Sequence, residues 1–382
     1  MAESPLFAKA KAEGKTSSNP LKESFGNKAN FKIVLLAFLG LTLGTGTMGW
    51  TGIYTQTFLV KIMFVDFDQA NTIVIIGILL GIPLFIFFGW LSDRIGRKYL
   101  LMLSLLLGTI CSRPIFSLIY QVPNLQHKVE NRSASIIDIK RQLLPSGDSL
   151  IATTIMHFYT DGTFFREEKT ELVFESNPRK TEIVKTIKIN NTDKWKLVLL
   201  IFLLEFIFAI SFGPIAAFMV EMFPLKIRYT SLSLPFHLGY GIFGGMGLLF
   251  ATYFVEKAKE AGNAEYYLAG LTYPIVLMSI SFVIGLLYLK ESKDGQLEVP
   301  MPYNNNYNKI KKLLGIVWIL LGIVAAYFGI VRLGIPKIMS GNQDDIIFGI
   351  IMMIIITPVA SISLFLFGKF ALQGEYDSKL SS

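Results

Sequence analysis

The sequence predicts an all-α polytopic membrane protein with a small extracytoplasmic β-rich insertion. Three observations predict this class: the mean hydropathy is +0.51, hydrophobic residues make up 52% of the 382 residues, and long apolar runs recur along the chain. A run of about 20 apolar residues can cross a bilayer as a helix. Eight such runs are present, at residues 33–57, 70–91, 99–121, 197–220, 229–255, 267–289, 313–333 and 346–368.

The net charge of +8 could indicate nucleic-acid binding, but the placement of the charges argues against it. With eight spans and both ends in the cytoplasm, the cytoplasmic tails and short loops carry 18 Lys and Arg residues, and the outer loops carry five. Residues 122–196 are left out of this count, because long loops cross largely regardless of charge. The excess predicts that both termini are cytoplasmic.

The spans and loops divide the chain into six segments. These are a cytoplasmic linker-like tail (1–32), helices one to three (33–121), an extracytoplasmic insertion (122–196), helices four to six (197–289), a cytoplasmic connector (290–312), and two extra helices with a short cytoplasmic tail (313–382).

The insertion alternates polar and apolar residues at 151–159 and 182–189, and Asp161-Gly162 is a common hairpin turn pair. These features predict a small β-rich subdomain. The last two helices are nearly uniformly aliphatic, so we expect them to form a lipid-facing scaffold.

The string GWLSDRIGRK lies in the short loop between spans two and three. Gly89 and Gly96 permit tight backbone turns and close helix approach. Asp93 can face the positive end of a helix dipole, and Arg94 and Arg97 can donate to a carboxylate on a neighbouring helix. Loops between spans are often positively charged simply because the charge sets the orientation in the membrane. A string of this length and pattern nevertheless favours a specific role.

A second string, GPIAAFMVEMFPLKIRYT, joins spans four and five, with Glu221 at the end of one helix and Arg228 near the start of the next. Together the two strings resemble the metabolite–proton symporter branch of the major facilitator superfamily. That branch includes proline/betaine, α-ketoglutarate and shikimate carriers. The resemblance covers residues from about 3 to 121 and from 196 to 292, and it is to the C-terminal half of these proteins.

The resemblance implies a six-helix half-bundle, followed here by two extra C-terminal helices. Such carriers rock two bundles around a site at their interface, so we expect a second six-helix half, supplied by a separate chain or a second copy. Asp93 would face a helix of that half, the region of Arg228 would receive its equivalent loop, and Glu221 would pair with Arg94 or Arg97. The expected conformational latch comprises Gly89, Asp93, Arg94, Gly96, Arg97, Glu221 and Arg228.

Span one is the expected substrate path, because it combines many glycines with Thr51, Tyr54 and Gln56. Glycine at that density weakens a helix, and transporters use such broken helices at their ligand sites. Glycine also permits tight packing between helices. Both alternatives stay open. The family often has Tyr-Thr-Gly-Gln-Phe-Tyr here, whereas this chain has WTGIYT and so lacks the amide.

Ionisable groups inside spans are functional candidates, because burying them in lipid is costly. Glu205 in span four is a candidate for a proton or transport role, or for a packing contact. His237 in span five is either a hydrogen-bonded core group or a proton carrier. Tyr240, in the same span, completes the substrate and proton pathway candidates.

These features predict a secondary active transporter half for a small polar or charged metabolite, proton-coupled and working by alternating access. The alternative is a non-transporting, truncated membrane protein that acts as an interaction or regulatory partner. No nucleophile–base set or phosphate loop appears, so we expect no enzyme activity, no cofactor, no metal and no nucleic-acid partner. We expect the protein to be integral to the bacterial inner membrane, in contact with lipid.

Overall fold

The chain forms eight helices that are long and apolar enough to cross a membrane, which confirms the number predicted from hydropathy. The fold is taken from a computed structural model, which describes residues 9, 12, 13, 17–49, 51–143, 149–173, 180–291, 305–341 and 343–376. The candidate spans are Lys28–Ile62, Phe67–Ile95, Arg97–Gln121, Asn191–Met222, Arg228–Glu260, Tyr266–Tyr288, Asn308–Ile338 and Asp345–Leu372.

Several spans are built from more than one helical segment. The α-helices are α2 (Lys28–Ala37), α3 (Leu43–Gly49), α4 (Thr51–Thr57), α5 (Phe67–Ile95), α6 (Arg97–Gln121), α7 (Asn191–Met222), α8 (Arg228–Phe236), α9 (Gly247–Glu260), α10 (Thr272–Tyr288), α11 (Asn305–Tyr327), α12 (Ile335–Ile338), α13 (Gln343–Ile351) and α14 (Thr357–Leu372). Wider π-helical segments cover Lys22–Gly26, Phe38–Thr42, Phe58–Ile62, His237–Gly244, Phe328–Gly334 and Met352–Ile356. Short 3₁₀ turns cover Leu125–His127, Arg132–Ala134 and Tyr266–Leu271.

Two spans begin earlier than their apolar runs. The Asn27 side chain accepts a hydrogen bond from the Ala29 N–H, so α2 starts at Lys28, inside the segment expected to be a linker-like tail. The Asn190 side chain likewise accepts from the Asp193 N–H at the start of α7. A side chain that accepts from the first free N–H groups fixes where a helix starts. Hydropathy marks only the apolar part of each helix.

The helices of the first six spans pack through small residues as well as apolar side chains. A Cβ added to Gly213 in α7 would come within 2.8 Å of the backbone nitrogen of Gly89 in α5. Similarly, a Cβ at Gly77 would lie 2.6 Å from the Ile201 side chain. Small residues let spanning helices approach closely where lipid offers no hydrophobic driving force.

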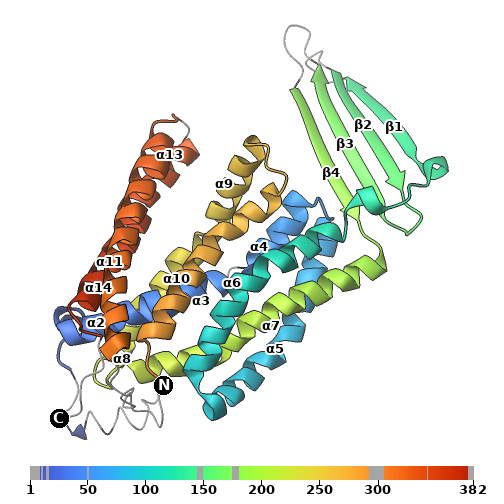
Figure 1. Cartoon of the computed structure of the whole chain (residues 1–382). Helices are drawn as coiled ribbons and strands as arrows, with labels where there is room; N and C mark the ends of the chain where they lie inside the picture. The colour runs from blue at the N-terminus through green and yellow to red at the C-terminus, as the bar shows by residue number, and fades with distance from the viewer. Residues whose placement is uncertain are drawn as a thin grey trace.

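The last two spans form a hairpin beside spans one, five and six (Figure 1). Its buried contacts centre on aromatic rings: Phe367 in α14 packs on Tyr288 in α10, with ring centroids 5.0 Å apart, and on Trp318 in α11. Glu375, just after α14, accepts hydrogen bonds from Lys28 at 2.6 Å and Lys32 at 2.5 Å. The hairpin thus packs against the bundle on one side, while Ile354, for example, is 70% exposed.

The expected β-rich insertion is present as a four-stranded antiparallel sheet in the order β1-β2-β3-β4. The strands are β1 (Ile136–Leu143), β2 (Ser149–Phe158), β3 (Phe164–Val173) and β4 (Lys180–Lys188). Gly162 lies in the turn between β2 and β3 with a φ of +86°, as the Asp-Gly pair predicts. The sheet projects from one end of the bundle (Figure 1), which we call the sheet end.

Backbone contacts join the sheet to the adjacent ends of the spans. Ile187 in β4 donates its N–H to the Phe64 carbonyl at 2.6 Å and accepts from the Asp66 N–H at 2.9 Å. The Gln69 side chain contacts both backbone polar groups of Ile189. These bonds attach the last strand to the loop between spans one and two.

A partly buried ammonium group fixes the base of the sheet to span four. Lys128 donates to Asp161 at 2.6 Å, to Asp193 at 2.5 Å and to the Thr163 hydroxyl at 2.9 Å. Asn190 donates to the same two carboxylates at 2.9 and 3.0 Å. We call these five residues the sheet anchor. It joins the β2–β3 turn, the segment after span three and the start of α7.

The anchor predicts a pH-dependent stability difference. Burial opposes the ionised form, but hydrogen bonds from Lys128 and from the Thr163 N–H prevail and lower the pKa of Asp161 from 3.8 to about 2. The contribution of this carboxylate is therefore complete above about pH 4 and is lost as the pH falls through about 2. We expect Lys128→Met to lower the midpoint of thermal unfolding at pH 7, with the difference from the wild type narrowing between pH 4 and pH 2. A difference that is constant over this range would contradict the role assigned to Lys128.

Candidate functional site

The loop between spans two and three makes its turn at a single residue. Gly96 separates α5 from α6 and has a φ of +101°, a conformation that side chains rarely adopt. A Cβ there would also lie 3.0 Å from the Tyr99 ring and 3.1 Å from a carboxylate oxygen of Glu291. Glycine is therefore required at this position for two independent reasons.

Arg97 links the ends of three spans. Its guanidinium donates to Asp93 at the end of α5, 2.7 Å away, and to Glu221 in the last turn of α7. The side chains of Arg97 and Glu221 are 20% and 18% exposed, whereas that of Asp93 is 63% exposed. Of the two arginines expected to pair with Glu221, Arg97 does so. Arg94 stacks on the Trp90 ring at 4.2 Å instead.

Two further residues, outside the expected latch, hold this loop. Glu291, just after span six, accepts from the N–H groups of Arg97 and Lys98, both at 2.9 Å. Lys98 in turn donates to the carbonyls of Leu286 and Leu289 at the end of α10. The carboxylate thus caps α6, where the helix dipole favours negative charge. In the sequence, only their positions as charged residues next to the ends of spans could have indicated this pair.

The remaining latch candidates shape the adjoining helix ends. Gly89 faces Gly213 across the contact between α5 and α7. The Arg228 guanidinium donates to the Phe223 carbonyl at 3.1 Å, which holds the turn between α7 and α8. The seven latch candidates therefore lie at one end of the bundle, opposite the sheet.

Glu205 lies where three spans meet. Glu205 is 8% exposed and occupies space left by two glycines. A Cβ added at Gly52 would lie 3.1 Å from the Glu205 carboxylate, and a Cβ added at Gly81 would lie 3.1 Å from the Glu205 Cβ. Within the described part of the chain, Glu205 has no ion-pair partner. One turn away, Gly49 faces Phe208 and, at 3.8 Å, the Tyr240 ring. Glu205 and Tyr240 therefore lie along the glycine-rich side of span one.

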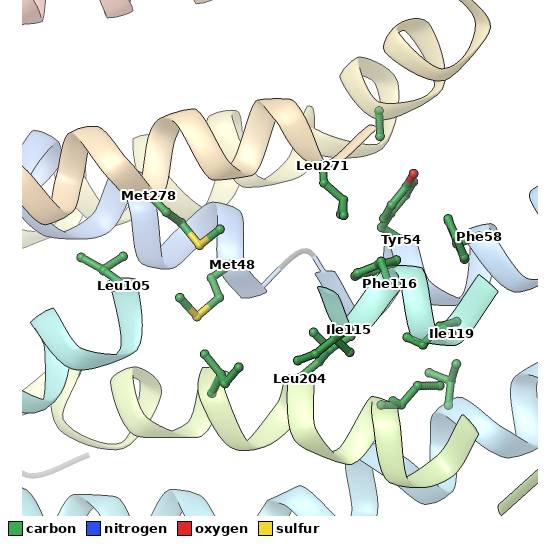
Figure 2. Close-up of a cluster of buried hydrophobic side chains, with 14 of the residues drawn as sticks. Met48, Tyr54, Phe58, Leu105, Ile115, Phe116, Ile119, Leu204, Leu271 and Met278 are labelled. Atoms are coloured by element: carbon green, nitrogen blue, oxygen red, sulfur yellow. The ribbon is translucent and has the colours of Figure 1, made fainter. Parts of the chain in front are cut away.

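The candidates on span one itself have different surroundings. Tyr54 is 1% exposed and packs against the rings of Phe58 and Phe116, with centroids 5.8 and 5.6 Å away (Figure 2). Gln56 donates to Asn71 in α5 at 3.0 Å. Thr51 belongs to α4, but its side chain lies outside the described part of the structure.

His237 lies three residues before Tyr240 in the same helical segment of span five. Its Nδ1 lies 2.8 Å from the Ser233 carbonyl, and the side chain is exposed. It lines an open groove with Leu21, Phe25 and Tyr229. The structure therefore places Glu205 and Tyr240 beside different glycines of span one, whereas the His237 side chain lies at the surface. Among the described residues, no cluster of His, Cys, Asp or Glu could hold a metal ion.

These observations define a polytopic membrane protein with a charged network at one end and a buried carboxylate among its spans. Residues 307–378, the last two spans, match a family described as "Family of unknown function (DUF6814)". A Haemophilus influenzae protein named "Putative metabolite transport protein" is 32% identical over 84 residues, which cover 22% of this chain and 17% of that protein. No solved structure matches the chain.

Proposed function

We propose that the first six spans are one half of a secondary carrier, of the metabolite–proton symporter branch of the major facilitator superfamily, that moves a small polar or charged metabolite by alternating access. The observation that carries this proposal is the bridge from Arg97 to Asp93 and Glu221. It joins spans two, three and four at one end, as the resemblance implies. The similarity to a metabolite transport protein supports the same function.

The exposure of Asp93 supports a second half as partner. Its carboxylate is 63% exposed although Arg97 binds it, so it can face a helix end of another bundle. The groove beside Tyr229, which is itself 66% exposed, lies at the start of span five. That half is a separate chain or a second copy, and its contacts with these two surfaces would hold one of two states.

Glu205 is the proposed proton-binding group. It lies about 21 Å along α7 from the helix start, estimated at 1.5 Å per residue, and so near mid-membrane. A carboxylate at such depth, with no cationic partner among the described residues, is costly unless it binds a proton or a cation in the working cycle. Its position against the glycine-rich span one joins the proton site to the proposed substrate path.

Vesicles that contain this chain and a six-span N-terminal half should take up a labelled metabolite when a pH gradient is imposed. We expect Glu205→Gln, which keeps the shape of the side chain, to reduce pH-driven accumulation at least tenfold. Exchange of the metabolite without a gradient should persist. Unchanged accumulation with Glu205→Gln would contradict the proton role.

The alternative, an interaction or regulatory partner that does not transport, is favoured by the sheet. Ile137 and Ile139 in β1 are 67% and 60% exposed, and Ile183 in β4 is 52% exposed. Exposed apolar residues on a sheet edge can bind another chain. If both halves insert correctly and none of the metabolites tested is taken up, the result would favour this alternative.

A further inference from the structure

A pocket opens at the sheet end of the bundle, between spans one and five. Its volume is about 200 Å³. This volume suits a molecule of the size of a small organic acid. Its charged lining residues are Lys61, Glu256 and Lys259.

The charges of the pocket are not neutralised by one another. Lys61 comes from the last turn of span one, and Glu256 and Lys259 come from α9. Within the described residues, none of the three has an ion-pair partner within 4.0 Å. By contrast, the neighbouring Lys257 donates to Glu260 at 2.6 Å. Two ammonium groups and one carboxylate therefore face the pocket, with an excess of one positive charge.

The other walls suit an uncharged body. Tyr54, Tyr266 and Phe64 supply aromatic surface, and Thr57 and Thr252 supply hydroxyl groups. Space for the Tyr54 ring depends on Gly270, since a Cβ there would lie 2.3 Å from the Tyr54 hydroxyl oxygen. Pockets with apolar walls and a few polar groups are typical of small-molecule sites.

Phe64 gives an independent indication of function at this place. It has a φ of +59°, the one positive value among the described residues other than glycine. The N–H of Ile187, in the sheet, donates a hydrogen bond to the Phe64 carbonyl at 2.6 Å. Such costly conformations persist where the surroundings impose them, and they cluster at ligand sites. The sheet thus fixes one wall of the pocket.

We infer that this pocket binds the carboxylate of a small organic monoanion through Lys61 and Lys259. The inference names the substrate class of the proposed carrier and so rests on that function. One net positive charge matches one carboxylate, whereas Glu256 would repel the second charge of a dianion or of phosphate. Because this chain alone lines the pocket, binding does not require the second half.

Binding is best measured by ligand-observed NMR on the whole chain in lipid nanodiscs at low salt, because salt screens exposed charges. The probes are propionate, its neutral counterpart propionamide, zwitterionic alanine, dianionic succinate and inorganic phosphate. We expect propionate to bind at least tenfold more tightly than propionamide, and more tightly than succinate or phosphate. Alanine binding as tightly as propionate would show that Glu256 accepts an ammonium group, and would overturn the monoanion assignment.

Charge-removing variants test the residues. Lys61→Gln and Lys259→Gln should each weaken propionate binding about tenfold, whereas the matched control Lys257→Gln, on the same helix but paired with Glu260, should not. Glu256→Gln should improve succinate binding. Equal binding by all lysine variants, with unchanged thermal unfolding, would overturn the inference.

The two proposals fail in different ways. If Lys61→Gln and Lys259→Gln leave uptake unchanged, the carrier function is supported, and the pocket is not part of the transport path. If both variants lose propionate binding but the protein shows no uptake in the presence of a second half, the binding site is supported and the carrier function is contradicted.

Discussion

Replacing Arg97 by alanine is expected to lower the free energy of unfolding by about 3 kcal/mol, because it leaves Glu221 largely buried without its partner. The Glu221 side chain is 18% exposed, and its second carboxylate oxygen has no hydrogen-bond partner among the described residues. Asp93 would lose the same guanidinium but is 63% exposed, so its share of the loss is small. Chemical unfolding in mixed micelles measures the change.

The double variant Arg97→Met with Glu221→Met is the control. Replacing both partners of a buried pair by apolar residues is often close to neutral. We therefore expect most of the lost stability to return in the double variant. A loss below about 0.5 kcal/mol in Arg97→Ala, the range of exposed pairs, would show that the bridge is a surface contact.

Adding one methyl group at Gly239 is expected to destabilise the protein by about 3 kcal/mol, the upper end of the cost of overpacking. A Cβ at this position would lie 2.3 Å from the Thr42 carbonyl oxygen. That contact is with backbone, so no side chain can move aside. On the other side of the same crossing, a Cβ at Gly46 would lie 2.4 Å from the Gly239 oxygen. Spans one and five therefore touch through their backbones.

Gly241 provides the matched control, because it lies in the same helical segment with nothing within 4 Å of an added Cβ. We expect Gly241→Ala to be neutral or to stabilise by up to about 1 kcal/mol, since alanine is the better helix former. The midpoints of unfolding of the two variants give the comparison directly. Equal effects would mean that spans one and five do not cross at Gly239.

Some of this structure could be predicted from sequence because it depends on local pattern. Hydropathy gave the number of spans, and alternation with an Asp-Gly turn gave the sheet. For span one, the glycines left two alternatives. The contacts of Gly46 with span five support tight packing, while those of Gly52 make room for Glu205. Tight packing is therefore shown at Gly46, and the ligand site remains a prediction.

The contacts that could not be predicted join residues far apart in the chain. The sheet anchor joins Lys128 to Asp193, and Glu291 caps a helix that begins at Arg97. Periodicity tells which residues lie in a span but not which span each will face. Tyr54 illustrates this, since its place in span one does not reveal that it packs against the Phe58 ring and lines a pocket.

The most direct test of the half-carrier account is pH-driven uptake measured in three sets of vesicles. One contains this chain, one contains a six-span N-terminal half, and one contains both, with insertion verified in each and a protonophore as control. The account predicts accumulation in vesicles that hold two complementary halves, abolished by the protonophore and reduced by Asp93→Asn. No accumulation in any of the three, with both pieces inserted and bound to each other, would contradict it.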